Sequence, residues 1–285
     1  MAPLTEKATS KYQQLETLKV HYNEAGEGEP LIFCVGNGPG TSAWVVYHRV
    51  FESLAQHFRC LLLDPPGYGK SDPVVLKGES RSTMYARTVR QFMDALKIDK
   101  ATIVDMSFGA QTGQVFGIEY PDRARKLVLH ACGVRMPAVF FNQPTEGVLA
   151  LANAFVDPTL ETMRAMMHSF LYKGDSYSDE ELMLKARLES WRARPELEQA
   201  RKQSDNIQRN VNNDLPKIKA PCLLIYGRDD RVLGGPEGAL VLLNYLHDAR
   251  LVILNKCGHW VPFERPDEFT RLVIDFVKYT KPVST

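Results

Sequence analysis

A serine with the surroundings of a nucleophile lies in IVDMSFGAQTG, residues 103–113, where an apolar run meets a turn and a helical pattern. Ser107 has a glycine two positions later, so its hydroxyl would lie at the start of a helix, whose amides favour negative charge. Such a serine attacks a carbonyl if a base and an orienting acid reach it. The position two residues before the serine, normally glycine in such a turn, is Asp105.

An acid and a base follow further apolar runs, in the chain order serine, acid, histidine. Asp230 lies in GRDDRV after the run CLLIYG, and His259 lies in KCGHWVPF after RLVILN. Each signal is weak alone, because most aspartates that follow strands are solvated turn residues. Together they predict a triad of Ser107, Asp230 and His259, with Asp229 as the alternative acid.

Donors for an oxyanion are predicted in the glycine-rich segment VGNGPGTSAW, residues 35–44. Its glycines would let the backbone approach a reacting oxygen closely. The predicted donors are the amide of Asn37 or Gly38 and the amide of Phe108, directly after the nucleophile. The alternative is an ordinary turn. Phosphate binding is the weaker interpretation, since no Walker-type lysine with serine or threonine follows.

Apolar runs of strand length, separated by helical patterns, would position these residues. The runs are residues 30–35, 59–64, 101–106, 126–131, 221–227 and 250–255. Each is nearly continuously apolar, as in strands covered by helices on both faces. The alternation predicts an α/β fold with a mostly parallel, doubly wound sheet.

A long interval without strand runs predicts a second region. Helical patterns occupy residues 146–155, 160–172 and 179–193. We therefore predict an α/β core formed by residues 1–134 and 207–285, with residues 135–206 as a helical cap inserted between two strands of the sheet.

Composition narrows the class of protein. The 285 residues are 44% hydrophobic and 24% charged, with a formal net charge of +1 and scattered basic residues. This predicts a globular protein that acts on a small molecule, and favours neither nucleic acid nor a membrane as partner. The five cysteines form no C-x-x-C pair, and no signal-like or membrane-spanning run is present. We expect a reduced, cytoplasmic protein without a metal or organic cofactor.

Several segments resemble those of the meta-cleavage product hydrolases: GNGPGTSAW, LLLDPPGYGKSDP, EYPDRARKLVL, DPTLETM, YGRDDR and KCGHWVPFERPDEFTRLVIDFV. These are α/β-hydrolases that hydrolyse a carbon–carbon bond in vinylogous 1,5-diketones from aromatic-ring degradation. The resemblance covers about residues 27–279, including the cap. It implies an α/β-hydrolase fold and no cofactor. Because the resembling family commonly assembles as dimers or higher oligomers, it also implies a homodimer or a larger homo-oligomer.

The resemblance also implies roles for individual residues. Ser107 and His259 would transfer the proton that converts the dienol substrate to its keto form, and water or the serine would then attack the distal carbonyl. Arg187, in ARLES, matches an arginine that binds the enolate and carboxylate end. Trp260 matches an aromatic residue of the same pocket. The alternative for Arg187 is a solvated helix arginine.

The sequence departs from the family pattern at polar positions. The histidine that usually begins the oxyanion loop is Val35, and the asparagine that precedes the nucleophile is Met106. A second asparagine of the family's pocket is replaced by Val46. Met106 and Val46 are thus predicted substrate-binding residues that offer apolar surface, and the substrate is expected to be more apolar than usual or of another class.

Asp105 would place a carboxylate in the core, and a buried carboxylate needs hydrogen-bond donors. We expect its carboxylate to occupy the volume vacated by the family's histidine and to accept backbone N–H bonds from the oxyanion loop. The alternative is that it disturbs catalysis by placing negative charge near the developing oxyanion.

Three functions remain open from the sequence. The leading one is a serine hydrolase that cleaves a carbon–carbon bond in a 2-hydroxy-6-oxo-dienoate-like diketone. The second is a carboxylesterase, lactonase or thioesterase that uses the same triad on a more apolar substrate. The third is a noncatalytic receptor on a hydrolase scaffold.

Overall fold

The computed structural model describes residues 4–107, 111–134, 144–174, 177 and 180–280, and its centre is a single eight-stranded sheet. The strand order is β1-β2-β4-β3-β5-β6-β7-β8. The strands are β1 (Ser10–Gln14), β2 (Lys19–Ala25), β3 (Pro30–Phe33), β4 (Arg59–Leu63), β5 (Ala101–Met106), β6 (Ala124–His130), β7 (Cys222–Gly227) and β8 (Ala249–Leu254). β1 pairs antiparallel with β2, and β2 with β4, whereas all pairings from β4 to β8 are parallel.

All six predicted runs form strands, which confirms the predicted α/β fold with a mostly parallel sheet. β1 and β2 were not predicted from the sequence. β1 is a polar edge strand with no fully buried residue, so no apolar run marks it. In β2 the buried positions include His21 and Asn23, which interrupt the apolar pattern although both are less than 2% exposed.

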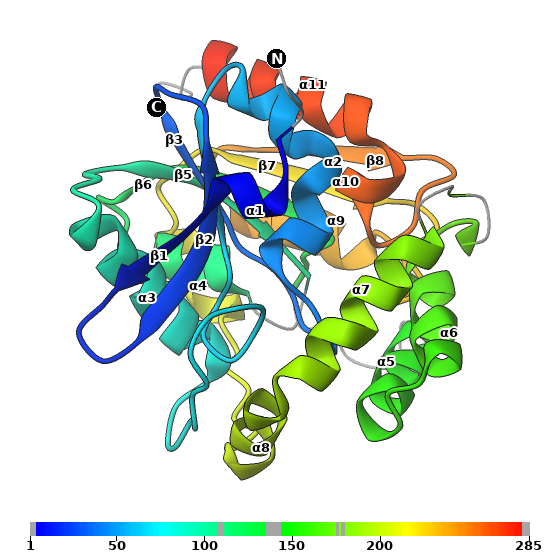
Figure 1. Ribbon diagram of the computed structural model, residues 1–285. Coiled ribbons are helices and arrows are strands. Elements are labelled where there is room, and N and C mark those ends of the chain that lie inside the picture. The colour runs from blue at the N-terminus through cyan, green and yellow to red at the C-terminus, as the bar shows by residue number, and fades with distance from the viewer. Residues whose placement is uncertain (1–3, 108–110, 135–143, 175–176, 178–179, 281–285) are drawn as a thin grey trace.

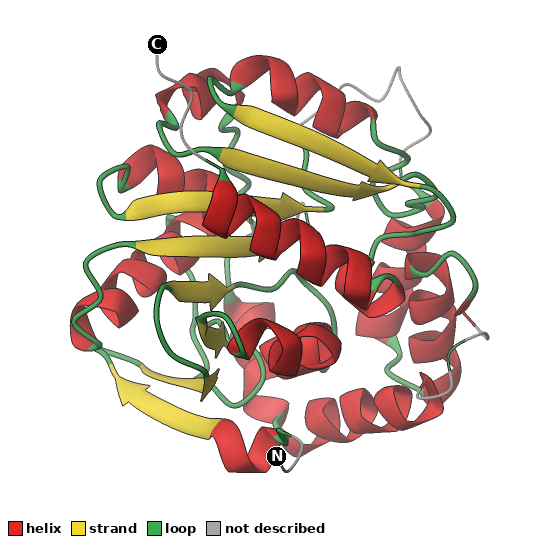
Figure 2. Cartoon of the chain, turned by 90° about the horizontal axis from the view of Figure 1, so that it is seen from above, coloured by secondary structure: helices red, strands yellow, loops and turns green. Residues whose placement is uncertain are grey.

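Helices cover both faces of the sheet (Figure 2). On one face, α2 (Ala43–Ala55) and α11 (Pro266–Tyr279) share an apolar cluster with Leu31 and Phe33 of β3. On the other face, α3 (Arg81–Ala95), α4 (Thr112–Glu119) and α9 (Glu237–Tyr245) share a cluster with Ile32. Successive residues of a strand thus enter opposite layers of the core, as its pleat requires. The shorter helices are α1 (Glu6–Thr9), η3 (Asn212–Lys217) and α10 (Val261–Glu264).

Among the described residues, four α-helices follow β6 and precede η3, in the interval for which the sequence predicts only helices. They are α5 (Glu146–Val156), α6 (Leu160–Phe170), α7 (Glu180–Ala193) and α8 (Pro195–Gln203). They lie together at one side of the molecule (Figure 1), where α6 packs against both α5 and α7. The hydroxyls of Thr145 and Thr159 cap the first turns of α5 and α6, which fixes where these helices begin.

The parallel strands determine where the functional residues meet. Strands β3, β5, β7 and β8 run in one direction, so the loops at their carboxyl ends gather at one edge of the sheet.

No helix in the described part of the chain combines the length and apolarity needed to cross a membrane.

Candidate active site

The backbone at Ser107 has the strained turn of a nucleophile elbow. Ser107 follows the last residue of β5 and has φ +72°, a left-handed backbone conformation that residues other than glycine rarely adopt. A Cβ on Gly36 would lie 2.7 Å from the Ser107 Cβ, so the loop after β3 can pass this close only with glycine there. The turn and its neighbour therefore leave the serine hydroxyl at the edge of the sheet.

His259 lies between the serine and an acid. Its Nε2 is 3.1 Å from the Ser107 Oγ, and its Nδ1 is 2.8 Å from an Asp230 carboxylate oxygen. Asp230 and His259 are 3% and 1% exposed, so water hardly competes for this pair. The second Asp230 oxygen accepts N–H bonds from Val232 (2.8 Å) and Leu233 (3.0 Å). Because the carboxylate holds Nδ1, Nε2 can accept the serine proton.

Among the described residues, no hydrogen bond or ion pair joins the alternative acid, Asp229, to His259. One Asp229 oxygen forms a 3.7 Å ion pair with Arg228. The imidazole bond goes to Asp230 instead. The geometry therefore favours Asp230, the acid preferred from the sequence.

The sequence predicts oxyanion donors in residues 35–44. Residues 36–42 of this segment, which we term the oxyanion loop, lie against the turn at Ser107 through Gly36. The Tyr68 hydroxyl donates to the side-chain oxygen of Asn37, and Thr41 accepts a 3.1 Å main-chain bond from the Gly69 N–H. Gly38 lies against Arg187, because a Cβ there would be 2.7 Å from the guanidinium. The third predicted donor, Phe108, lies outside the described residues.

Arg187 is fully buried in α7, unlike a solvated helix arginine. One terminal nitrogen donates to the Pro39 carbonyl and the Thr41 hydroxyl, each at 2.9 Å. Nε and the other terminal nitrogen have no hydrogen-bond partner among the described residues. The guanidinium carbon lies 5.2 Å from the centroid of the Trp260 ring. Burial lowers the pKa of Arg187 to about 10, so it stays cationic at neutral pH with donors to spare for an anion.

The other predicted substrate-binding residues form apolar surface. Met106, Val46 and Trp260 are 2–3% exposed and belong to one cluster that continues into the helices after β6. Other members of this cluster from α6 and α7 are Met163, Met166, Met167, Phe170, Met183, Leu184 and Leu188. Phe170 also fixes the histidine loop, since its carbonyl accepts the His259 N–H at 2.6 Å.

Asp105 contacts a different element from the one expected. Its carboxylate accepts the N–H of Gly113 in α4 at 2.8 Å, not an N–H of residues 36–42. The hypothesis of a bond to the oxyanion loop is therefore wrong. Asp105 lies on the same side of β5 as Ile103, toward α4, because residues two apart share a face. A Cβ on Gly113 would lie 3.0 Å from the Asp105 Cβ, so glycine allows this approach.

Asp105 is expected to make stability depend on pH. Burial raises its pKa to about 7, although the amides of Gly113, Met106 and Thr112 act in the opposite direction. The unfolded chain ionises near pH 4, so the folded state binds more protons between these values, and stability falls as pH rises. From pH 5 to 8, wild type should lose about 2–3 kcal/mol of unfolding free energy relative to Asp105→Asn, measured by urea unfolding. Parallel pH curves for the two proteins would contradict this assignment.

Three contacts at the site were not anticipated from the sequence. Thr41 and Pro39 bind Arg187, and Tyr68 binds Asn37. Tyr68 lies in LLLDPPGYGKSDP, a segment in which the sequence predicts no site residue. The many prolines and glycines that follow an apolar run in this segment indicate a tightly folded loop. They do not show that Tyr68 binds Asn37.

No metal-binding group of three or more His, Cys, Asp or Glu residues occurs within the described ranges. All five cysteines are buried and free.

The fold and the triad geometry are those of an α/β-hydrolase, and comparison with known families agrees. Residues 29–266 match the family described as the alpha/beta hydrolase fold. The chain therefore belongs to the α/β-hydrolase family.

Full-length relatives define a narrower group. The chain is 38% identical to a 2-hydroxy-6-oxo-6-phenylhexa-2,4-dienoate hydrolase of Comamonas testosteroni, over 98% of this chain and 99% of that protein. It is 37% identical to a 2-hydroxy-6-oxononadienedioate/2-hydroxy-6-oxononatrienedioate hydrolase of Burkholderia vietnamiensis, over 96% and 97%.

Solved structures agree with this group. A 2-hydroxy-6-oxo-6-phenylhexa-2,4-dienoate hydrolase from Rhodococcus sp. strain RHA1 superposes with a TM-score of 0.84 at 25% identity, covering 94% of this chain and 98% of that one. A meta-cleavage product hydrolase from Pseudomonas fluorescens IP01 gives 0.80 at 26% identity, covering 94% and 97%. Within the α/β-hydrolases, the chain is a member of the meta-cleavage product hydrolases.

Proposed function

We propose that this protein hydrolyses a carbon–carbon bond in a 2-hydroxy-6-oxo-dienoate, with Ser107, His259 and Asp230 as its triad. The observation that carries the proposal is the pairing of two features in one site. One is the unbroken hydrogen-bonded series from the serine hydroxyl to the Asp230 carboxylate. The other is the buried Arg187, whose free donors suit the carboxylate and enolate end of such a substrate.

The reaction has two stages in this proposal. First, Ser107 and His259 transfer a proton from the substrate's enol oxygen to carbon, which gives the keto form. Water or Ser107 then adds to the distal carbonyl, with His259 taking the proton of the attacking O–H. Main-chain amides of the oxyanion loop stabilise the resulting oxyanion, and the carbon–carbon bond breaks. Overall, one water contributes OH to the acyl fragment and H to the carbon that leaves.

We further propose that residues 135–206 act as a cap on a core of residues 1–134 and 207–285. Arg187 of α7 bonds to the oxyanion loop, and Phe170 of α6 bonds to the histidine loop. Both contacts support a position for α6 and α7 over the site. In this arrangement the cap would shield the reaction from bulk water and supply the cationic end of the pocket.

A second candidate is an esterase, lactonase or thioesterase. Met106 and Val46 favour it, since both present apolar side chains where the resembling family uses asparagine. Neither replacement disturbs the triad, so the chemistry of ester hydrolysis is compatible with this site. A reducing, cytoplasmic location fits both candidates, because every cysteine is free.

Parallel assays separate these candidates. In one assay the protein is incubated with 2-hydroxy-6-oxo-6-phenylhexa-2,4-dienoate, and hydrolysis is measured from the loss of the substrate's yellow colour. In the other assay it is incubated with a short p-nitrophenyl ester. We expect kcat/KM for the dienoate to exceed that for the ester by at least about 100-fold, because only the dienoate engages Arg187. The reverse ranking would favour the esterase. Failure of Ser107 to react with a fluorophosphonate probe, with no turnover of either substrate, would favour a noncatalytic receptor.

A further inference from the structure

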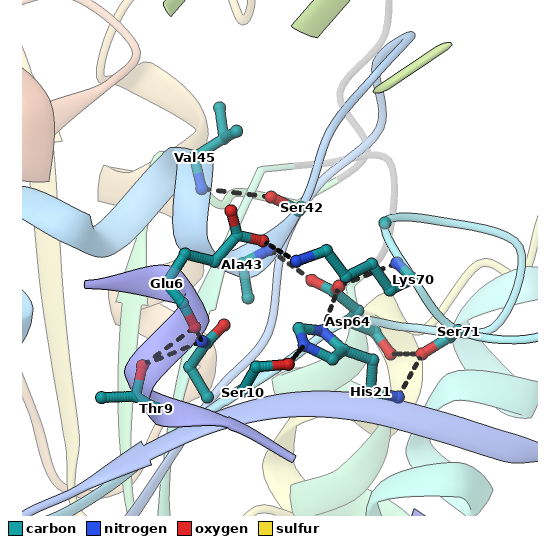
Figure 3. Close-up of polar contacts among 12 residues, drawn as sticks. Glu6, Thr9, Ser10, His21, Ser42, Ala43, Val45, Asp64, Lys70 and Ser71 are labelled. Carbon is teal, nitrogen blue, oxygen red and sulfur yellow. Dashed lines mark hydrogen bonds and ion pairs between the residues drawn. The ribbon is translucent and has the colours of Figure 1, made fainter. Parts of the chain in front are cut away.

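A second serine–histidine–aspartate array lies outside the proposed triad, at the junction of β1, β2 and β4 (Figure 3). The Ser10 hydroxyl is 2.8 Å from Nε2 of His21, and Nδ1 of His21 is 2.8 Å from a carboxylate oxygen of Asp64. His21 and Asp64 are 0% and 1% exposed. The connectivity repeats that of Ser107, His259 and Asp230, and both acids accept main-chain N–H bonds. The donors to Asp230 lie two and three positions along the chain, whereas Ala43, a donor to Asp64, lies 21 positions away.

The Asp64 carboxylate is occupied by main-chain donors. One oxygen accepts the Ala43 N–H at 2.7 Å, and the other accepts the Lys70 N–H at 3.0 Å in addition to His21. A Cβ on Gly69, whose φ is +53°, would lie 2.1 Å from that second oxygen, so the backbone wraps closely around the carboxylate. An acid bound in this way holds backbone in place.

The backbone held by Asp64 includes the end of the oxyanion loop. Ala43 is the first residue of α2 and directly follows residues 36–42. A carboxylate at this position also favours the amino-terminal end of the 13-residue helix. The position and orientation of α2 therefore depend on Asp64, and His21 fixes the carboxylate from the other side.

Two more bonds join the same two segments. Residues 64–71, which we term the support turn, also provide the Gly69 N–H to the Thr41 carbonyl at 3.1 Å. The Tyr68 hydroxyl donates to the Asn37 side-chain oxygen. Three contacts from the support turn therefore reach the beginning, the end and the following residue of the oxyanion loop.

We propose that Asp64 and Tyr68 are positioning residues that hold the oxyanion loop at the distance its amides need. This proposal rests on the function proposed above. Neither side chain is assigned a contact with substrate, and both act through residues 36–43. Oxyanion stabilisation depends on the placement of donors within a few tenths of an ångström, so a loosened loop should slow the step that forms the oxyanion. It should leave the earlier proton transfer unchanged.

Stopped-flow kinetics with the phenyl dienoate test this separation, because enol loss and product formation are followed at different wavelengths. Asp64→Asn and Tyr68→Phe should slow carbon–carbon cleavage about 10–100-fold and accumulate the keto form, with ketonisation and KM within about threefold of wild type. Tyr85→Phe is the matched control, since Tyr85 is a buried tyrosine packed near Tyr68 with no assigned contact to the loop. It should behave as wild type.

Other outcomes count against the proposal. Equal slowing of both steps, or no slowing, in Tyr68→Phe would overturn it, and this mild variant decides the matter if Asp64→Asn does not fold. If wild type hydrolyses only the p-nitrophenyl ester, the proposed substrate is wrong but the positioning role remains testable. In that case Tyr68→Phe should lower kcat for the ester about tenfold with KM unchanged, and an unchanged kcat would overturn the positioning role.

Discussion

Replacing Ser107 by alanine is expected to lower kcat for the dienoate by a factor of about 10³–10⁵. The hydroxyl that His259 contacts at 3.1 Å would be gone, so neither the serine-dependent proton transfer nor a serine attack could occur. The fold should persist, because alanine tolerates the left-handed backbone at φ +72° about as well as serine does. Steady-state kinetics give the loss in kcat, and thermal unfolding checks the fold.

Ser10→Ala provides a control with the same local chemistry. Ser10 also lies 2.8 Å from a histidine that is bound to a buried aspartate. Loss of the Ser10 hydroxyl should change kcat by less than about threefold, because this hydroxyl contacts neither the oxyanion loop nor the turn at Ser107. Equal losses in the two variants would mean that serine–histidine contacts matter only for folding, and full activity in Ser107→Ala would remove the proposed nucleophile.

The elements of the core could be predicted because strands buried on both faces have a distinctive pattern. Runs such as residues 101–106 and 221–227 are apolar throughout, and their parallel arrangement brings the residues that follow them to one edge. Chain order at strand ends was therefore enough to predict that Ser107, Asp230 and His259 would converge. The distances between them required coordinates.

Contacts between segments far apart in the sequence could not be predicted in this way. His21 and Asp64 are separated by 43 positions and meet only because β2 pairs with β4. β2 itself escaped recognition, since its buried polar residues resemble those of a loop. The structural role of His21 and Asp64 depends on the pairing of β2 with β4, which no local sequence pattern reveals.

Asp105 shows a different limit. The sequence indicated correctly that this carboxylate needs backbone donors. It did not identify which layer of the core Asp105 enters. That choice depends on the pleat of β5, which sends Met106 toward the layer of α2 and Asp105 toward α4. Neighbouring residues of a strand face opposite layers of the core, so an error of one position changes the element that a side chain contacts. The expected partner of Asp105 was therefore wrong, although its need for a main-chain donor was correct.

Arg187→Met is expected to lower kcat/KM for the dienoate about 10²–10³-fold while the protein stays as stable as wild type or becomes more stable. The guanidinium is fully buried, and two of its nitrogens have no partner in the described structure. Burial of a cation without a complete set of partners costs free energy, which an apolar side chain of similar length avoids. The substrate's carboxylate would lose its counter-charge. Kinetics and thermal unfolding of the same samples measure both effects.

Two comparisons separate substrate binding by Arg187 from its contact with the oxyanion loop. Thr41→Val removes one of the loop bonds to the guanidinium but leaves the charge, so it should affect the dienoate far less than Arg187→Met does. An uncharged p-nitrophenyl ester offers no carboxylate, so Arg187→Met should change its kcat/KM by less than about tenfold. Arg192→Met, at an exposed position of the same helix, controls for loss of a positive charge. If the ester and the dienoate lose equally, Arg187 supports the loop and does not bind the substrate's anionic end.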